Sequence, residues 1–204
     1  MERLQIVHIH DVEQSDLDTV MNGARRALHE LQREGVIDHV GVSGGPVAVL
    51  SEFIETGEFD SVITHNRFNL LDQPARSLLE RARQLQMITI NAAPFATGLL
   101  ADPNRSKLTY GYQPANQNVV ERALKMETIC RDAEIDLATT ALRFSLESPL
   151  IDITIVGMKS IAEVETAVNA MSTSLPIGLL ETINTSVPPN LIDDVEAWRT
   201  RASP

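Results

Sequence analysis

The chain has 204 residues, of which 43% are hydrophobic and 22% are charged, as in a folded globular domain and unlike a disordered or fibrous protein. Its 17 Lys and Arg residues against 28 Asp and Glu residues give a formal net charge of −11, which argues against nucleic acid or anionic membranes as partners. No apolar run approaches the roughly 18 residues of a membrane helix, and no secretory signal is visible. We therefore expect one domain over residues 1–204, in the cytoplasm, since the single cysteine, Cys130, has no disulfide partner.

Apolar runs rich in β-branched residues alternate with segments of helical periodicity along the chain. The predicted strands cover residues 4–9, 36–42, 61–64, 87–91 and 151–156. The first predicted helix begins at a capping pattern formed by Ser15 and Asp18 and ends before Gly35. The other predicted helices cover residues 46–54, 74–85, 119–133, 137–146, 161–171 and 188–198, and a loop spans 92–116.

This alternation predicts parallel strands, as in a β/α barrel or a doubly wound sheet. No Gly-x-Gly-x-x-Gly pattern follows the first strand, so the dinucleotide fingerprint of the doubly wound fold is absent. A closed barrel needs eight strands and about 250 residues, whereas this chain offers five strands in 204 residues. We therefore expect an α/β fold, an incomplete (β/α)8 TIM barrel with about five of eight units present and open strand edges.

The sharpest local motif is His8-Ile9-His10-Asp11, at the end of the first predicted strand. Alternation along a strand places both histidines on one side, with His10 nearer the rim. His10 is then a hydrogen-bond donor or proton carrier toward a bound carbonyl. Alternatively, both histidines bind a divalent metal, although only His65 and Asp152 could complete that site, or both are core residues satisfied by backbone groups.

Three further strand ends have residues suited to binding. Ser43, Gly44 and Gly45 either present a hydroxyl and backbone N–H groups to an amide or phosphate, or form a tight turn before a helix. Residues 65–72 put five polar groups at one strand end, more than a connector needs, which favours a functional role. Residues 157–160 place a glycine, a cation and a hydroxyl where a helix begins, which favours a bound phosphate group.

Taken in order, these pieces resemble the C-terminal two thirds of an aldo-keto reductase, a family of (β/α)8-barrel oxidoreductases that use NAD(P)H without a Rossmann domain. The resemblance covers nearly the whole chain. Within the family, the Gly44-Gly45-Pro46 and Ala93-Pro94-Phe95 sequences are most similar to sugar dehydrogenases that act on aldoses such as L-galactose. The segments that support the resemblance are 6–11, 31–43, 67–73, 92–100, 141–144 and 155–158.

The resemblance implies roles for individual residues. His10 matches the family's catalytic histidine, which orients the substrate carbonyl beside a tyrosine acid. Ser43 matches the residue that holds the nicotinamide carboxamide, with Gly44 where asparagine is usual, and His65 stands where a glutamine often touches the same amide. The loop over the pyrophosphate corresponds to Pro94, Phe95, Ala96, Gly98 and Leu99, and the adenosine-phosphate side to Gly157, Met158, Lys159 and Ser160.

The chain also departs from the family pattern. Ala92 stands where many members stack an aromatic ring on the nicotinamide, and Val164 where NADP-preferring members often place an arginine, which favours NAD over NADP. The family's catalytic aspartate, tyrosine and lysine belong to barrel units that would precede Met1, and Tyr110 and Tyr112 do not match the catalytic tyrosine. Because carbonyl reduction needs a proton donor, we expect this chain by itself to be inactive or nearly so.

The expected function is that of an NAD(P)-dependent oxidoreductase of the aldo-keto reductase family, with an aldehyde or sugar hemiacetal as substrate and NAD or NADP as cofactor. The alternative is a degenerate, non-catalytic barrel fragment that retains part of a dinucleotide-binding cleft and acts through binding or through its open strand edges. A metal-assisted hydrolase that uses His8 and His10 is a third alternative. No residue of the chain identifies the substrate or the oligomeric state.

Overall fold

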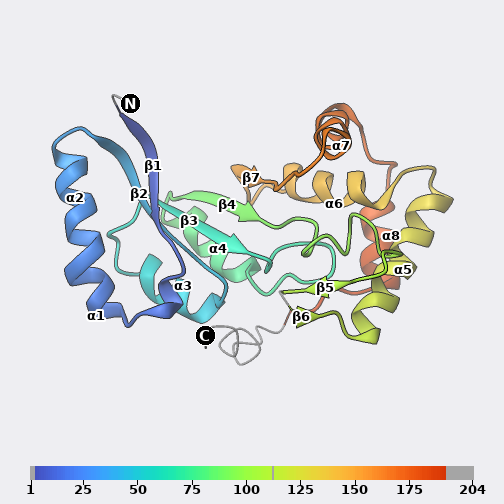
Figure 1. Ribbon diagram of the computed structural model, residues 1–204, viewed down its shortest axis with the longest axis horizontal. Helices are drawn as coiled ribbons and strands as arrows, with labels where there is room; N and C mark the ends of the chain where they lie inside the picture. The colour runs from blue at the N-terminus through green and yellow to red at the C-terminus, as the bar shows by residue number, and fades with distance from the viewer. Residues whose placement is uncertain (1–2, 112, 192–204) are drawn as a thin grey trace.

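Five parallel strands form one sheet in the order β1-β2-β3-β4-β7 (Figure 1). The computed structural model describes residues 3–111 and 113–191. All five predicted strands are confirmed, with β2 longer at its carboxyl end and β7 shorter than predicted. The strands are β1 (Leu4–Ile9), β2 (Ile37–Gly44), β3 (Ser61–His65), β4 (Ile88–Ala92) and β7 (Ile153–Ile155).

Helices connect the strands, and Figure 1 shows α5 to α8 grouped on the β7 side of the sheet. None of the helices in the described part of the chain is long and apolar enough to cross a membrane. The helices are α1 (Leu17–Val20), α2 (Arg26–Arg33), α3 (Val47–Ile54), α4 (Arg76–Gln84), α5 (Gln117–Asp132), α6 (Leu137–Leu146), α7 (Ile161–Ser172) and α8 (Leu179–Ser186).

The structure differs from the predicted elements in three places. The first predicted helix is divided into α1 and α2 by a π-helical turn over Met21–Arg25. Helix α8 was not predicted from the sequence. A short antiparallel hairpin of β5 (Thr109–Tyr110) and β6 (Gln113–Pro114) was not predicted either. Of the helix predicted over 188–198, residues 188–191 are not helical, and the remainder lies outside the described residues.

Four helices begin at a side chain that accepts a hydrogen bond from the backbone N–H three residues further on. At α1 this residue is Asp16, which accepts from Thr19, so the predicted pair of Ser15 and Asp18 does not form the cap. The caps of α5, α6 and α7 are Asn116, Asp136 and Ser160. Satisfying these N–H groups sets where each helix starts, and the start of α7 lies at the site described below.

The two faces of the sheet differ in polarity. On one face, Val40 and Val42 of β2 are fully buried and belong to the same core as Leu50 and Phe53 of α3. Burial of such a side chain stabilises the fold by about 1.5 to 3 kcal/mol. The outer face of the sheet, against the helices, is therefore the hydrophobic core.

The other face has polar side chains that meet across strands. His8 of β1, Gly41 of β2 and Ser61 of β3 are in register, and His8 Nε2 lies 3.0 Å from Ser61 Oγ. This hydrogen bond passes over Gly41, where a Cβ would overlap both side chains. Glycine at position 41 is therefore required by the close approach of the two neighbours.

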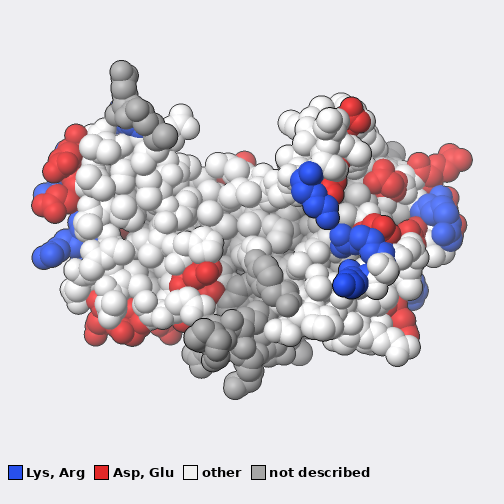
Figure 2. Space-filling view, viewed as in Figure 1, with Lys and Arg blue, Asp and Glu red and all other residues white. Residues whose placement is uncertain are grey.

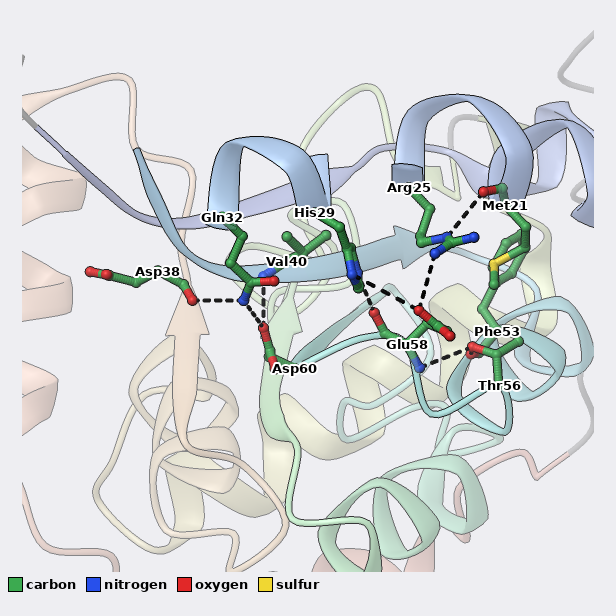
Figure 3. Close-up of polar contacts among 10 residues, drawn as sticks. All are labelled: Met21, Arg25, His29, Gln32, Asp38, Val40, Phe53, Thr56, Glu58 and Asp60. Atoms are coloured by element: carbon green, nitrogen blue, oxygen red, sulfur yellow. Dashed lines mark hydrogen bonds and ion pairs between the residues drawn. The ribbon is translucent and has the colours of Figure 1, made fainter. Parts of the chain in front are cut away.

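A polar network joins α2 to the segment just before β3 (Figure 3). The carboxylate of Asp60 accepts hydrogen bonds from the backbone N–H of Val40 at 2.9 Å and from Gln32 Nε2 at 3.0 Å. In the π-helical turn before α2, Arg25 pairs with Glu58 at 3.3 Å. These contacts lie at the amino ends of β2 and β3, opposite the rim where the candidate site is found.

Candidate functional site

Two adjoining cavities lie at the carboxyl ends of the strands. The first, here the His10 cavity, has a volume of about 500 Å³ and is lined by residues that follow or end β1 to β4. The second, the α7 cavity, has a volume of about 810 Å³ and lies between the loop after β4 and the start of α7. Both are lined by His65, Ala92 and Ile155, so the two cavities adjoin along a shared wall, and together they are called the rim groove.

His10 and His8 have different surroundings. The side chain of His10 is 81% exposed and lines the His10 cavity, and its Nδ1 lies 3.1 Å from Oδ1 of Asp11. Asp11 has a left-handed backbone with φ of 51°, an uncommon conformation for a non-glycine residue. Its carboxylate is thus placed to hold one ring nitrogen of His10, which leaves Nε2 for a ligand.

His8 is held by Ser61 within the inner face of the sheet. Burial lowers the pKa of His8 to about 4, because a charged imidazole would lose its water. No group of three His, Cys, Asp or Glu side chains able to hold a metal ion lies together in residues 3–111 and 113–191. The two histidines therefore do not act as a pair, and the metal alternative gains no support.

The end of β2 is built around Glu13, which the sequence analysis did not select. A Cβ at Gly44 would overlap the Glu13 carboxylate, and Gly45 N donates to Glu13 Oε1 at 3.4 Å. Ser43 is 4% exposed, and its hydroxyl donates to the carbonyl of Ile9 at 3.4 Å. Glycine at position 44 thus lets a carboxylate approach the backbone beside the His10 cavity.

Of the polar segment 65–72, only His65 lines the rim groove. Asn69 is fully buried, and its Oδ1 accepts from the backbone N–H groups of Leu71 and Asp72. Burial also raises the pKa of Asp72. Asn69 therefore helps to hold the loop in place, and His65 is the member of this segment that faces the rim groove.

The loop after β4 bends through several left-handed residues. Ala93, Ala96 and Thr97 have φ of 60°, 50° and 59°, and Gly98 has φ of 88°. This path turns the Ala96 side chain into the core, where it is fully buried. Strained backbone of this kind is concentrated at binding sites.

Only part of this loop faces the rim groove. Pro94, Phe95 and Gly98 line the α7 cavity. Ala96 and Leu99 are 0% exposed and are absent from its wall. Their predicted cofactor contact is not supported by the geometry, because their side chains pack into the core.

Arg105 lines the α7 cavity opposite α7 and was missed by the sequence analysis. A Cβ at Gly98 would overlap its guanidinium, so the absence of a side chain at Gly98 makes room for the arginine. Its Nε is buried, with no hydrogen-bond partner among the described residues. As a cation on the cavity wall, the guanidinium of Arg105 is suited to bind an anion through its N–H groups.

The start of α7 forms the other wall of the α7 cavity. Gly157, Met158 and Lys159, which the resemblance assigns to the adenosine-phosphate side, line it. Ser160 does not line the cavity, because its hydroxyl caps α7 by accepting from Glu163 N at 3.2 Å. Glu163, which was not predicted, lines the wall instead.

Positive charge gathers at the α7 cavity although the chain as a whole is strongly acidic. Arg105 and Lys159 come from separate segments and line the same space. Figure 2 shows Lys and Arg atoms on the part of this face below α7, with acidic atoms beside them. The local charge favours an anionic ligand in this half of the rim groove.

A family model described as the aldo/keto reductase family matches residues 1–186. The chain belongs to the aldo/keto reductase family. The resemblance predicted from the sequence motifs is thereby confirmed, and so is the predicted similarity to sugar dehydrogenases.

Two curated aldo/keto reductase relatives are sugar dehydrogenases by name. The chain is 27% identical to a D-threo-aldose 1-dehydrogenase of a Pseudomonas species, over 88% of this chain and 55% of the relative. It is 26% identical to an L-galactose dehydrogenase of Arabidopsis thaliana, over 88% of this chain and 57% of the relative. The chain therefore spans little more than half the length of these relatives.

A solved aldo-keto reductase of Bacillus halodurans, in its holo form, has the same fold. The TM-score is 0.74 at 17% sequence identity, with 97% of this chain and 62% of that chain covered. With five parallel strands and their helices, the described part of the chain is an incomplete (β/α)8 barrel, as predicted.

Proposed function

We propose that the rim groove binds an NAD(P) dinucleotide. We also propose that the protein is part of an oxidoreductase whose substrates are aldehydes or sugar hemiacetals. The observation that supports this most directly is that the His10 cavity and the α7 cavity adjoin, with His65, Ala92 and Ile155 lining both. A dinucleotide is long and needs such an extended groove, with a redox end and an anion-binding end. The names of the two sugar dehydrogenase relatives support the substrate class.

The residues of the α7 cavity fit the anionic part of such a cofactor. Arg105 has a buried Nε without a hydrogen-bond partner in the described chain, and Gly98 leaves its guanidinium uncovered by a side chain. We propose that Arg105, the Pro94 to Gly98 loop and Lys159 hold the diphosphate. Gly157 and Met158 would lie along the adenosine side.

The His10 cavity fits the reacting end. Ser43, Gly44 and His65 line it and are proposed to hold the nicotinamide carboxamide. When bound, the dinucleotide supplies or accepts a hydride at C4 of its nicotinamide ring. In its doubly protonated form, with Nδ1–H directed to Asp11, His10 would donate Nε2–H to the substrate oxygen and stabilise the charge that forms there.

A proton donor is the missing part of this arrangement. Within residues 3–111 and 113–191, no tyrosine lines the His10 cavity. Tyr110 lies in β5, and its hydroxyl is buried without a hydrogen-bond partner among the described residues. Since proton transfer contributes about 10² to 10⁴-fold to such reactions, we propose that this chain by itself binds the cofactor but turns over little or no substrate.

Single residues support two further proposals, on the preferred cofactor and on the cellular location. The apolar Val164 in place of a cation favours NAD over NADP. Cys130 is a buried free thiol, which is consistent with the cytoplasm. We also propose that residues 1–204 act as one partial barrel domain whose ligands are small molecules rather than nucleic acid or membranes.

The test is a fluorescence titration of NADH with the purified chain. We expect saturable binding, weakened about 10-fold by Arg105→Ala, because a charge-assisted contact to the diphosphate is lost. Arg33→Ala is the matched control, since Arg33 is exposed on α2, away from the rim groove. Absence of saturable binding, or equal weakening by both variants, would contradict the proposal.

A degenerate, non-catalytic barrel fragment is the second candidate, favoured by the absence of a tyrosine from the described wall of the His10 cavity. Cofactor reduction, followed as NADH formed from NAD in the presence of aldoses, separates the two candidates. Binding of NADH with no turnover at any chain concentration fits the fragment, whereas slow turnover that rises in proportion to chain concentration fits the oxidoreductase. Turnover that disappears in His10→Ala but persists in His39→Ala would instead establish a catalytic chain, because His39 lies outside both cavities.

A further inference from the structure

The first turn of α7 places a carboxylate on the wall of the α7 cavity. Glu163 lines this wall together with Gly157, Lys159 and Thr166. Val164, whose apolar side chain is the sequence argument for NAD, is 43% exposed and is absent from the wall. Of the two charged residues of α7, Glu163 and Glu165, it is therefore Glu163 that lines the cavity, one position before Val164.

Hydrogen bonds fix the position of this carboxylate. Its Oε2 accepts from the backbone N–H of Lys159 at 2.7 Å, while its own backbone N–H donates to Ser160 Oγ at 3.2 Å. This reciprocal pair is a capping box that includes the residue before the cap. Among the described residues, these bonds engage only Oε2 of the carboxylate, which leaves Oε1 able to accept from a ligand.

The carboxylate occupies the place where the start of α7 would otherwise attract an anion. Helix N-termini favour negative charge through their free N–H groups and dipole, and here Glu163 already supplies that charge. A second anion at this place would be repelled, because like charges a few ångströms apart oppose each other. A hydroxyl group, by contrast, can donate a hydrogen bond to Oε1.

NAD and NADP differ only at the adenosine ribose. Both have the diphosphate, so Arg105 and Lys159 on the cavity wall attract the two dinucleotides through the group that they share. NADP has an additional phosphate on the adenosine ribose, where NAD has a free 2′-hydroxyl. A carboxylate that accepts from the ribose hydroxyl favours NAD, and a cation is needed to accommodate the 2′-phosphate.

We propose that Glu163 is the specificity-determining residue that makes the rim groove prefer a dinucleotide with a free ribose 2′-hydroxyl over its 2′-phosphorylated form. The proposal rests on the proposed binding of a dinucleotide in the rim groove. The preference for the free hydroxyl would then arise from the negative charge of the Glu163 carboxylate. Hydrogen bonds with Lys159 and Ser160 hold this carboxylate in place.

The experiment titrates the full chain with NADH and with NADPH and compares their dissociation constants. We expect the wild type to bind NADH at least about 10-fold more tightly, and Glu163→Gln to reduce this ratio about 10-fold, mainly through tighter binding of NADPH. The glutamine keeps an oxygen that can accept from Lys159 N, so the capping contact survives. Glu165→Gln is the matched control, because Glu165 is an exposed residue of α7 outside the cavity wall.

Four outcomes would overturn the proposal. Equal wild-type affinities for the two dinucleotides would remove the preference itself while leaving the proposed function standing. An unchanged ratio in Glu163→Gln, or the same change in Glu165→Gln, would show that this carboxylate is not the cause. Failure of both dinucleotides to bind would end this proposal together with the proposed function, so the two failures can be told apart.

Discussion

The environment of His8 is set by two neighbouring residues on adjacent strands. Its Nε2 lies 3.0 Å from Ser61 Oγ, and Gly41 between them has no side chain to intervene. Burial lowers the pKa of His8 to about 4 from the ordinary value of 6.5. The neutral ring is therefore part of the folded structure, and its charged form is disfavoured.

This shift predicts how stability depends on pH. Between pH 6.5 and about 4 the unfolded chain takes up a proton on His8 that the folded chain does not bind, so the free energy of unfolding falls as the pH falls through this window. We expect a loss of about 1 to 2 kcal/mol, less than the full shift implies because the ring is partly exposed and water screens it.

Urea unfolding at pH 7 and at pH 4.5 measures this loss. His8→Gln, which cannot titrate, should show a smaller loss than the wild type, while the carboxylates common to both proteins contribute equally. An identical pH dependence in the two proteins would contradict the low pKa of His8.

At the scale of elements, α2 shows how a helix with little buried surface is held. None of its eight residues is fully buried. Its side chains instead join the polar network of Figure 3, in which Gln32 donates to Asp60 and to the carbonyl of Asp38. Because a short helix is marginal without tertiary contacts, this network is expected to contribute to the attachment of α2.

Asp60→Ala tests that contribution. The substitution removes the acceptor of two hydrogen bonds, from Val40 N and Gln32 Nε2, and should lower the free energy of unfolding by about 1 to 3 kcal/mol. Asp60→Asn keeps an acceptor oxygen and should lose about half as much or less. Equal losses in the two variants, measured by urea unfolding, would mean that the hydrogen bonds are not the cause.

At the scale of the whole molecule, one side of the sheet ends in exposed apolar surface. Ile153 and Ile155 of β7 are 41% and 45% exposed, and Ile161, Val168 and Met171 of α7 are 79%, 58% and 66% exposed. Within the described residues, β1 and β7 each pair with one neighbouring strand only. Exposed apolar surface next to a free strand edge favours association.

Charged substitutions on α7 test this expectation. The double variant Val168→Lys and Met171→Lys should lower light scattering at high protein concentration and leave the thermal midpoint within about 2 °C, because both side chains are largely exposed. Ile183→Lys on α8 is the contrasting control and should prevent folding, since Ile183 is fully buried. A fall of more than about 5 °C in the double variant would show that this face of α7 is packed.

Local pattern predicted the elements whose periodicity is long or strongly apolar. The five strands were found because short β-branched runs alternate with helical segments. α8 was missed because its buried positions, Leu179 and Ile183, lie among Thr, Asn and Ser residues that are typical of loops. The β5–β6 hairpin has two residues in each strand, too few for any periodicity to appear.

The candidate site was partly predictable for a related reason. Residues that follow parallel strands meet at one rim, so His10, Ser43 and Gly157 were expected near one another, and all three line the rim groove. Glu163 had a signal that was not used, because Ser160 and Glu163 have the spacing of a capping box. Arg105 had none, since its contact with Gly98 depends on the path of the intervening loop.

The sequence by itself determined the five parallel strands, the helices with long periodic patterns and the family, because these depend on local periodicity and on motifs that keep their order along the chain. Only the tertiary structure decided which side chains face the rim groove. Left-handed residues turn Ala96 into the core, and the helical rotation from one residue to the next brings Glu163 rather than Val164 to the cavity wall. Orientation depends on contacts between distant segments, and no single stretch of sequence contains them.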